Sequence, residues 1–320
     1  VNGRPKLDQF FMNIYANQNK MYEDFKNKSL TAIAAVNTPP SSVFEGAGVI
    51  KHNLILRAAN MVFFKTSTGV LGDQSVRQAL GEATNQKDIL NKLGYMTVPV
   101  KEPLLIGQLG YNPIYAQSPF NLSAAKQKLM SDGWTSFKKG VRQKNNQFLN
   151  FTLVAANTTE NQTVTKILKS NWQKLGVNLT IQLQNQTDFQ QSLTYHDYDA
   201  VLTSITIGSD PDVFVYWDSS QADIRSANRL NLSEYKNPIV DVAVESGRTR
   251  IDPTERIIKY QSLLSQWQQD TPAVGLFQPR LLYLTNGPVG AIDNQSLNTS
   301  IDRFDNVQDW AVKQAKVSPN

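Results

Sequence analysis

The fold is decided by one stretch of the chain, Tyr198-Asp-Ala-Val-Leu-Thr-Ser-Ile-Thr-Ile-Gly-Ser-Asp-Pro-Asp-Val-Phe-Val-Tyr-Trp217. Residues 200–207 are apolar and rich in β-branched side chains, which is typical of a buried strand. Gly208 and its successor break that pattern. Asp210 followed by proline then indicates a helix start, because aspartate accepts from free first-turn N–H groups and proline fits the first helical position. The stretch therefore predicts a strand, a turn and a helix.

This turn is a candidate binding site for a small polar molecule. Backbone groups that leave a β-ladder at a strand end need partners from water or from a ligand. Two carboxylates and three aromatic side chains follow in the sequence, and a few polar groups among aromatic ones are typical of ligand pockets. A capped helix that packs its aromatic residues into the core explains the same residues equally well. Both interpretations stay open at this point.

The composition limits the chemistry that the chain can perform. With 320 residues, 40% of them apolar, the chain suits two lobes better than one hydrophobic core. It has no cysteine, which removes disulfides, thiol nucleophiles and thiolate metal sites. The two histidines, His52 and His196, fall in segments expected in different lobes, so a histidine metal site or a Ser-His-Asp triad is not expected. We predict no catalytic residues, no metal and no cofactor.

Charge and hydropathy indicate neither a nucleic-acid nor a membrane-spanning protein. The formal net charge of +5 is spread out apart from a cluster at residues 138–144, so nucleic-acid binding is weakly supported. Phosphate-binding glycine patterns are absent. No run of about 18 apolar residues and no signal-peptide layout is present. The sequence lacks an initiator Met, which suggests a processed chain or a fragment.

Periodicity predicts alternating strands and helices along the rest of the chain. The segments 148–156, 163–175 and 177–183 form a strand-helix-strand unit, whose strands should pair in parallel through a right-handed crossover. We expect this sheet to include residues 200–206. We also predict strands at 4–16, 30–36 and 55–64, a strand pair or extended run at 273–284, and helices at 20–28, 123–132, 188–193, 238–245 and 253–270.

Six blocks of sequence, taken in order, resemble those of a known family. They are Asp73-Gln-Ser-Val-Arg-Gln-Ala-Leu80 with Asn85-Gln-Lys-Asp-Ile89, Leu122 to Trp134, Leu168 to Leu179, Asp210-Pro-Asp-Val-Phe214, Asn231 to Asp241, and Asp270 to Leu276. This order is similar to that of the extracellular solute-binding proteins of the oligopeptide/dipeptide class, family 5, which feed ABC importers. Each block is short, but together they extend over residues 60–290.

The resemblance implies an α/β, two-lobed periplasmic-binding-protein-like fold. Residues 70–276 would form lobe two, while residues 1–69 and 277–320 would belong to lobe one. A complete family member has a long segment before the position of Gly3, so lobe one is expected to be incomplete here.

The resemblance also implies a function without catalysis. The protein would capture a peptide or a similar small polar ligand by lobe closure and deliver it to an ABC permease. We expect it to be extracellular, on the cell surface or in the periplasm, membrane-anchored in its full-length form and monomeric, and to bind no nucleic acid. The alternative is a surface interaction or adhesion protein that keeps the fold without transport.

The family pattern differs from this sequence where a peptide N-terminus would bind. The Asp that pairs with a ligand α-ammonium falls on Ile207, and a family Trp falls on Ser204. A family Asn falls on Lys65. An ammonium buried without a partner is costly, so a neutral or hydroxyl-rich ligand, or a peptide held through its backbone, fits better. The predicted ligand-binding residues are Lys65, Ser204, Thr206, Ile207, Gly208, Asp210, Tyr216, Trp217 and Asn228.

Overall fold

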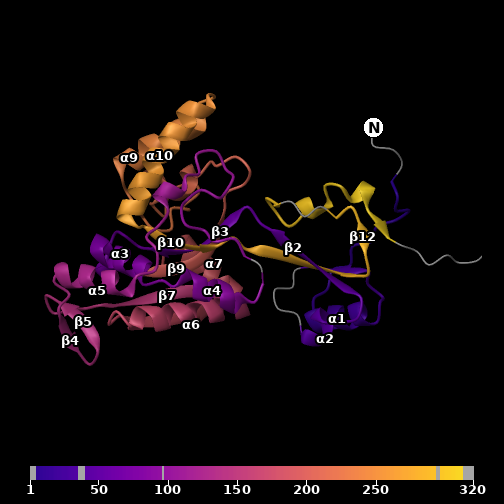
Figure 1. Ribbon diagram of the computed structural model, residues 1–320, viewed down its shortest axis with the longest axis horizontal. Coiled ribbons are helices and arrows are strands. Elements are labelled where there is room, and N and C mark those ends of the chain that lie inside the picture. Colours follow the sequence, from indigo (N-terminus) through magenta and orange to yellow (C-terminus); the bar gives the residue numbers. More distant parts are fainter. Residues whose placement is uncertain (1–4, 35–39, 96, 293–295, 313–320) are drawn as a thin grey trace, which may run out of the picture. The chain divides into compact units, whose positions relative to one another are not determined.

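The structure is a computed structural model in which residues 5–34, 40–95, 97–292 and 296–312 are described (Figure 1). The chain divides into two compact units. The smaller comprises Val1–Arg57 and Pro279–Asn320, and the larger comprises Ala58–Gln278.

The larger unit is built on a mixed five-stranded sheet with the strand order β10-β3-β9-β7-β8. The central strand β9 is antiparallel to β3 and parallel to β7, and β7 is parallel to β8. The strands are β3 (Ala58–Phe64), β7 (Asn150–Ala156), β8 (Asn178–Gln184), β9 (Ala200–Thr206) and β10 (Ala273–Phe277). The predicted sheet of residues 150–155, 178–183 and 200–206, with its parallel pair, is therefore confirmed.

Helices cover both faces of this sheet, as Figure 1 shows for α4 and α6 on one side and α9 and α10 on the other. Successive residues of a strand point to opposite faces, so both sides of β3 can be apolar. Phe64 joins the core formed with α3, α4, α5 and α6, whereas Phe63 joins the core formed with α8, α9 and α10. The helices are α3 (Gln74–Glu82), α4 (Gln86–Leu93), α5 (Leu122–Ser131), α6 (Thr159–Gln173), α7 (Gln186–Tyr195), α8 (Phe214–Trp217), α9 (Pro238–Thr249) and α10 (Pro253–Asp270).

Helix starts in this unit follow the capping signals of the sequence. The Asp73 side chain accepts from the Ser75 N–H at the start of α3. Asp252 accepts from the N–H groups of Thr254 and Glu255, and Pro253 occupies the first position of α10. These bonds satisfy first-turn donors that have no partner within the helix. The predicted bounds of α10, 253–270, are those of the structure.

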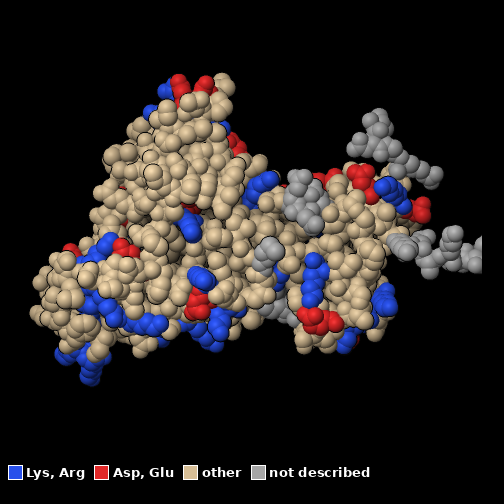
Figure 2. Space-filling view, viewed as in Figure 1, with Lys and Arg blue, Asp and Glu red and all other residues tan. Residues whose placement is uncertain are grey.

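A small antiparallel sheet carries a cluster of basic side chains. It consists of β4 (Ser136–Lys138), β5 (Val141–Lys144) and β6 (Gln147–Phe148). Between residues 133 and 187 the sequence has seven Lys and Arg residues and one acidic residue, Glu160. Figure 2 shows blue side chains gathered over β4 and β5. The cluster that the sequence indicates at residues 138–144 therefore lies on this hairpin, where Lys138 and Lys139 are exposed and Arg142 is buried.

The smaller unit is organised around β11 (Arg280–Asn286), which pairs with β1 (Ala32–Ile33) on one side and with β2 (Val49–Ile55) on the other. The helices α1 (Gln18–Lys26) and α2 (Ser41–Phe44) pack beside this sheet around Phe25 and Val43. A second pair joins β12 (Val289–Gly290) to β13 (Ala311–Val312). The smaller unit also has two single turns of 3-10 helix among its described residues, η4 (Asp302–Phe304) and η5 (Val307–Asp309). The larger unit has three such turns in its described part: η1 (Gly69–Gly72), η2 (Pro113–Tyr115) and η3 (Ser219–Gln221).

Three expectations differ from the structure. The described residues 5–16 form no strand: the Lys6 N–H donates to the Gln308 oxygen at 3.3 Å, but no β-ladder among the described residues includes this segment. The larger unit begins at Ala58 rather than at residue 70, because β3 is hydrogen-bonded to β9 and β10. It ends at Gln278 rather than at residue 276. Residues 1–4, 35–39, 293–295 and 313–320 of the predicted lobe one, and with them part of the predicted strand 30–36, lie outside the described residues.

The predicted helix start at Asp210 is also wrong. Residues 208–211 form a turn, and α8 begins at Phe214 without a side-chain cap. The Asp210 carboxylate pairs with Arg256 instead of capping a helix. Among the described residues, no helix has both the length and the apolar character needed to cross a membrane.

Candidate functional site

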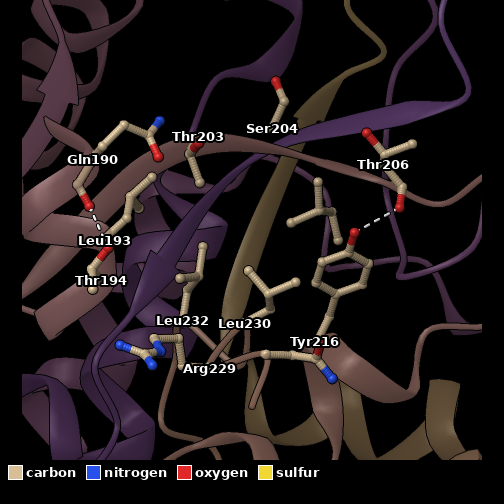
Figure 3. Close-up of a pocket in the computed structure, with 12 residues that line it drawn as sticks. Gln190, Leu193, Thr194, Thr203, Ser204, Thr206, Tyr216, Arg229, Leu230 and Leu232 are labelled. Atoms are coloured by element: carbon tan, nitrogen blue, oxygen red, sulfur yellow. Dashed lines mark hydrogen bonds between the residues drawn. The ribbon is translucent and has the colours of Figure 1, made fainter. Parts of the chain in front are cut away.

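A pocket of about 400 Å³ opens beside the end of β9 in the larger unit. We call it the β9 pocket. Strand β9, helices α7 and α8, and the loop at residues 228–232 all contribute to its wall (Figure 3). The lining residues are Gln190, Leu193, Thr194, Thr203, Ser204, Ile205, Thr206, Tyr216, Asn228, Arg229, Leu230 and Leu232.

One edge of β9 is free where it borders this pocket. The ladder with β3 covers all of β9, but the ladder with β7 ends at the pair Ala155–Leu202. The backbone groups of successive strand residues point alternately to the two neighbouring strands. Because the Lys65 N–H donates to the Asp199 oxygen at 2.9 Å, odd-numbered residues of β9 face β3. The backbone groups of Ser204 and Thr206 therefore point to the side where β7 has ended.

Tyr216 confirms this direction independently. Its hydroxyl donates to the backbone oxygen of Thr206 at 2.7 Å, as the dashed line in Figure 3 shows. Burial raises the pKa of the Tyr216 hydroxyl, so the hydroxyl remains a donor. Within the described part of the chain, the ladders leave the N–H and C=O of Ser204 unpaired. A free strand edge of this kind can bind another extended backbone.

The structure brings four of the predicted site residues together. Ser204, Thr206, Tyr216 and Asn228 all line the β9 pocket. The first two come from β9, the third from α8 and the fourth from the loop that follows. Asn228 donates from its amide to Oε1 of Gln221 at 3.3 Å. Residues of the strand, the short helix and the loop therefore meet at one pocket.

Ile207 and Trp217 lie in the core instead. Trp217 has no exposed surface, stacks on Phe63 with ring centroids 5.8 Å apart and meets Trp267 edge-on at 6.0 Å. Ile207 is 5% exposed and belongs to the same apolar cluster. Adjacent residues of a helical turn point in different directions, so Tyr216 faces the pocket while Trp217 faces the core. Neither residue lines the β9 pocket. For Trp217 the alternative stated above, an aromatic side chain packed into the core, is therefore the correct one.

Gly208 and Asp210 serve the turn after β9. Gly208 has a φ of 79°, which glycine adopts without strain, and its oxygen accepts from Nε2 of Gln108 at 2.7 Å. Asp210 is exposed and forms an ion pair with Nη2 of Arg256 at 2.6 Å. Neither residue lines the β9 pocket. Their role in the structure is to hold the turn.

Lys65 lies at a second pocket, of about 550 Å³, together with Gln184, Asp188, Gln191, Ser192, Tyr195, His196 and Asp197. Its ammonium is already engaged. Lys65 Nζ donates to the backbone oxygen of His196 at 2.9 Å and lies 3.3 Å from Oε1 of Glu234. Lys65 therefore acts in this structure as a link between β3 and the loop that carries Glu234.

His196 connects this link to the wall of the β9 pocket. Its Nε2 lies 3.0 Å from the backbone oxygen of Arg229, which can only accept a hydrogen bond. Its Nδ1 lies 3.3 Å from Oε1 of Glu234. The Arg229 N–H donates to Oγ of Ser226 at 3.0 Å. Both backbone polar groups of Arg229 are thus held by side chains.

Sequence reasoning missed the contribution of α7 and of the loop after Asn228 to the pocket. Gln190, Leu193 and Thr194 of α7 have no local signal that distinguishes them from other surface-helix residues. Arg229 is adjacent to the predicted Asn228 and could have been included for that reason. In the described residues, no three His, Asp or Glu side chains gather as a set of metal ligands.

A mixed sheet with helices on both faces and a ligand-sized pocket at a strand end is the architecture of the periplasmic-binding-protein class. The chain belongs to the family described as bacterial extracellular solute-binding proteins, family 5, middle: the sequence model of that family matches residues 1–226. The family recognised from the sequence blocks is confirmed.

Relatives and solved structures agree with this assignment. The oligopeptide-binding protein OppA of Lactococcus lactis subsp. cremoris is 25% identical over 225 residues, which are 64% of this chain and 36% of OppA. The chain spans about a third of the length of the curated relatives it matches. NikZ from Campylobacter jejuni, in complex with Ni(L-His), has a TM-score of 0.81 at 20% identity over 92% of this chain and 60% of its own.

AppA from Bacillus subtilis, solved in complex with a nonapeptide, has a TM-score of 0.78 at 16% identity. The match covers 94% of this chain and 60% of AppA. At these identities the structures establish the fold alone. The predicted two-lobed fold class is confirmed, and the chain represents about 60% of the length of those structures.

Proposed function

We propose that this chain is part of the solute-binding subunit of an ABC importer, and that its ligand is a peptide held mainly through its backbone. Membership of a family of extracellular solute-binding proteins supports the general role. The oligopeptide-binding relative and the nonapeptide complex of AppA support a peptide as the ligand. The free edge of β9 at the pocket is the observation that carries the proposal.

An extended peptide fits this edge for a physical reason. The Ser204 N–H and C=O point into the side of β9 that β7 leaves uncovered. A ligand strand laid along residues 203–206 would pair with these groups, while its side chains alternate between the pocket and solvent. Apolar Leu193, Leu230 and Leu232 line the same pocket and would receive side chains of varied kind.

Capture would follow the mechanism of two-lobed binding proteins. We assign the larger unit to lobe two and the smaller unit to part of lobe one. A ligand that contacts both lobes only in the closed state shifts the population toward that state. The permease would then receive the ligand from an extracellular or periplasmic, membrane-anchored, monomeric protein, which performs no catalysis. The relatives give no support to the alternative of an adhesion protein.

Backbone methylation tests the proposal. Isothermal calorimetry with the full-length protein would first identify a binder in a pool of tripeptides to pentapeptides. N-methylation of the peptide bond that pairs with Ser204 removes one donor, and we expect a roughly tenfold loss of affinity, as for one hydrogen bond of about 1.4 kcal/mol. A set of singly methylated peptides should show alternating sensitivity. A pool without any binder, or binding of Ni(L-His) instead, would refute a peptide ligand.

A further inference from the structure

We propose that the guanidinium of Arg229 is an anion-binding group of the β9 pocket, and that the pocket selects ligands that present a carboxylate. This inference rests on the proposed function and specifies its ligand class. Its starting point is an arginine whose backbone is fixed and whose charge is unused.

The guanidinium of Arg229 is not paired with a carboxylate among the described residues, unlike the guanidinium groups of the other arginines in the same part of the chain. Between residues 225 and 256 the other four arginines each pair with a carboxylate: Arg225 with Asp223, Arg248 with Asp212, Arg250 with Glu255 and Arg256 with Asp210. Among the described residues, Arg229 has no carboxylate within 4.0 Å and its guanidinium donates no hydrogen bond. It is also half-buried rather than fully hydrated.

The pocket itself supplies no negative charge that could neutralise this cation. Arg229 is the one charged residue in the lining; the remainder are Leu, Ile, Thr, Ser, Gln, Asn and Tyr. Arg229 and Thr194 both line the pocket and are drawn on the same side of it in the view of Figure 3. The side-chain amide of Gln190 and the hydroxyl groups of β9 can add hydrogen bonds to an anion held there, whereas the Thr194 hydroxyl already donates to the backbone oxygen of Gln190 at 2.8 Å. The lining therefore complements an anionic group and has no acidic residue to attract an ammonium.

The backbone of Arg229 is arranged to hold the side chain at this place. Its φ of 46° lies in the left-handed region, which few residues other than glycine adopt and which often occurs at ligand sites. Ser226 accepts from its N–H, and Nε2 of His196 lies 3.0 Å from its oxygen. His196 is itself held by Glu234, and Glu234 by Lys65. The side chain is thus the one part of Arg229 that the protein leaves free for a ligand.

A carboxylate is the anion that a peptide offers. Arginine binds a carboxylate through two parallel N–H···O bonds, a geometry that an amide cannot reproduce. The carboxylate can come from the C-terminus of a peptide or from an Asp or Glu side chain. These two sources share one chemistry at Arg229, and matched peptides distinguish them.

The test uses the full-length protein and the tightest peptide of the pool, made as the free acid, as the C-terminal amide and with each Glu or Asp replaced by its amide. We expect one of these changes to reduce affinity about tenfold or more, which identifies the source of the carboxylate. Arg229→Gln should remove that preference, so that acid and amide bind equally. Arg225→Gln, in the same loop and 87% exposed, should retain it.

Two outcomes would overturn the inference. If the unaltered protein binds every acid and its amide equally, Arg229 is no anion site although the protein binds peptides. If Arg229→Gln keeps the preference with an unchanged unfolding temperature, another residue holds the carboxylate. A pool with no binder refutes the proposed function, and this inference with it. Because the Arg229 side chain contributes no bond to the fold, Arg229→Gln should fold normally, which its unfolding temperature checks.

Discussion

The core beside α10 and the pocket loop at residues 218–235 are stabilised in different ways. The core consists of Leu263, Leu264 and Trp267 packed on Trp217 and the sheet, with no exposed surface. The loop is held by hydrogen bonds and ion pairs between residues far apart in sequence, such as His196 to Arg229. Close apolar packing makes the core rigid, whereas the polar network sets the position of individual side chains at the pocket.

The largest effect should come from the core. Leu264→Ala removes a fully buried side chain and leaves a cavity, so we expect a loss of about 2–5 kcal/mol in the free energy of unfolding. Urea unfolding measures it. Ile258→Ala, on the exposed side of the same helix, should change stability by less than about 0.5 kcal/mol. Equal effects of the two substitutions would show that the packing of α10 differs from the structure.

That contrast also explains what the sequence could predict. The apolar spacing in 253–270 and the strand-helix-strand order of 148–183 report burial directly, so the sheet and its main helices were found. The position of Trp217 was not, because an aromatic residue after a turn is equally compatible with pocket and core. The link from Lys65 through Glu234 to His196 joins residues up to 169 positions apart, and no local pattern reveals such contacts.

The next largest effect on stability should come from the buried carboxyl group of Glu102, which among the described residues has no cationic partner such as the one Glu234 has in Lys65. Glu102 has no exposed surface, Oε1 accepts from the Asn112 N–H at 3.2 Å, and Oε2 has no partner. Burial raises the pKa of Glu102 from 4.5 to about 7. The folded state therefore binds a proton more tightly than the unfolded state, so the protein loses stability as the pH rises from about 4.5 to about 7.

Glu102→Gln should remove this loss. Because one pKa unit corresponds to about 1.4 kcal/mol, we expect the variant to be more stable than the unaltered protein by about 3 kcal/mol above pH 7 and similar to it near pH 4. Thermal or urea unfolding as a function of pH measures the difference. Glu245→Gln, exposed on α9, is the matched control and should leave the pH profile unchanged. A profile for Glu102→Gln parallel to that of the unaltered protein would contradict the assignment.

A smaller and local effect is expected from the network. His196→Asn keeps a residue that tolerates the left-handed backbone at this position but cannot hold Arg229 and Glu234 together. Loss of one or two hydrogen bonds should lower the free energy of local opening of the loop by about 1–2 kcal/mol. Amide hydrogen exchange should accelerate at residues 229–234 while α10 is unaffected. The neighbouring variant Tyr195→Phe should change neither, and uniform acceleration throughout the larger unit would mean that His196 supports the core as well.

The smallest expected effect is the change in affinity when the ligand N-terminus is blocked. We expect this change to be near zero. A protein that anchors a peptide by its ammonium needs a carboxylate in the pocket, because an unpaired buried ammonium is costly. Ile207 lies in the core where the family pattern has that carboxylate, and the described lining of the β9 pocket has none. N-acetylation of a bound peptide should therefore change its affinity less than about twofold, or about 0.4 kcal/mol, whereas amidation of its carboxylate at Arg229 should cost about tenfold. Calorimetry on the same peptide in its free, acetylated and amidated forms measures both ends under identical conditions. A loss of affinity of about tenfold or more on acetylation would contradict this prediction. It would mean that a carboxylate outside the β9 pocket binds the ligand ammonium, and that polar side chains beyond the pocket loop also position the ligand.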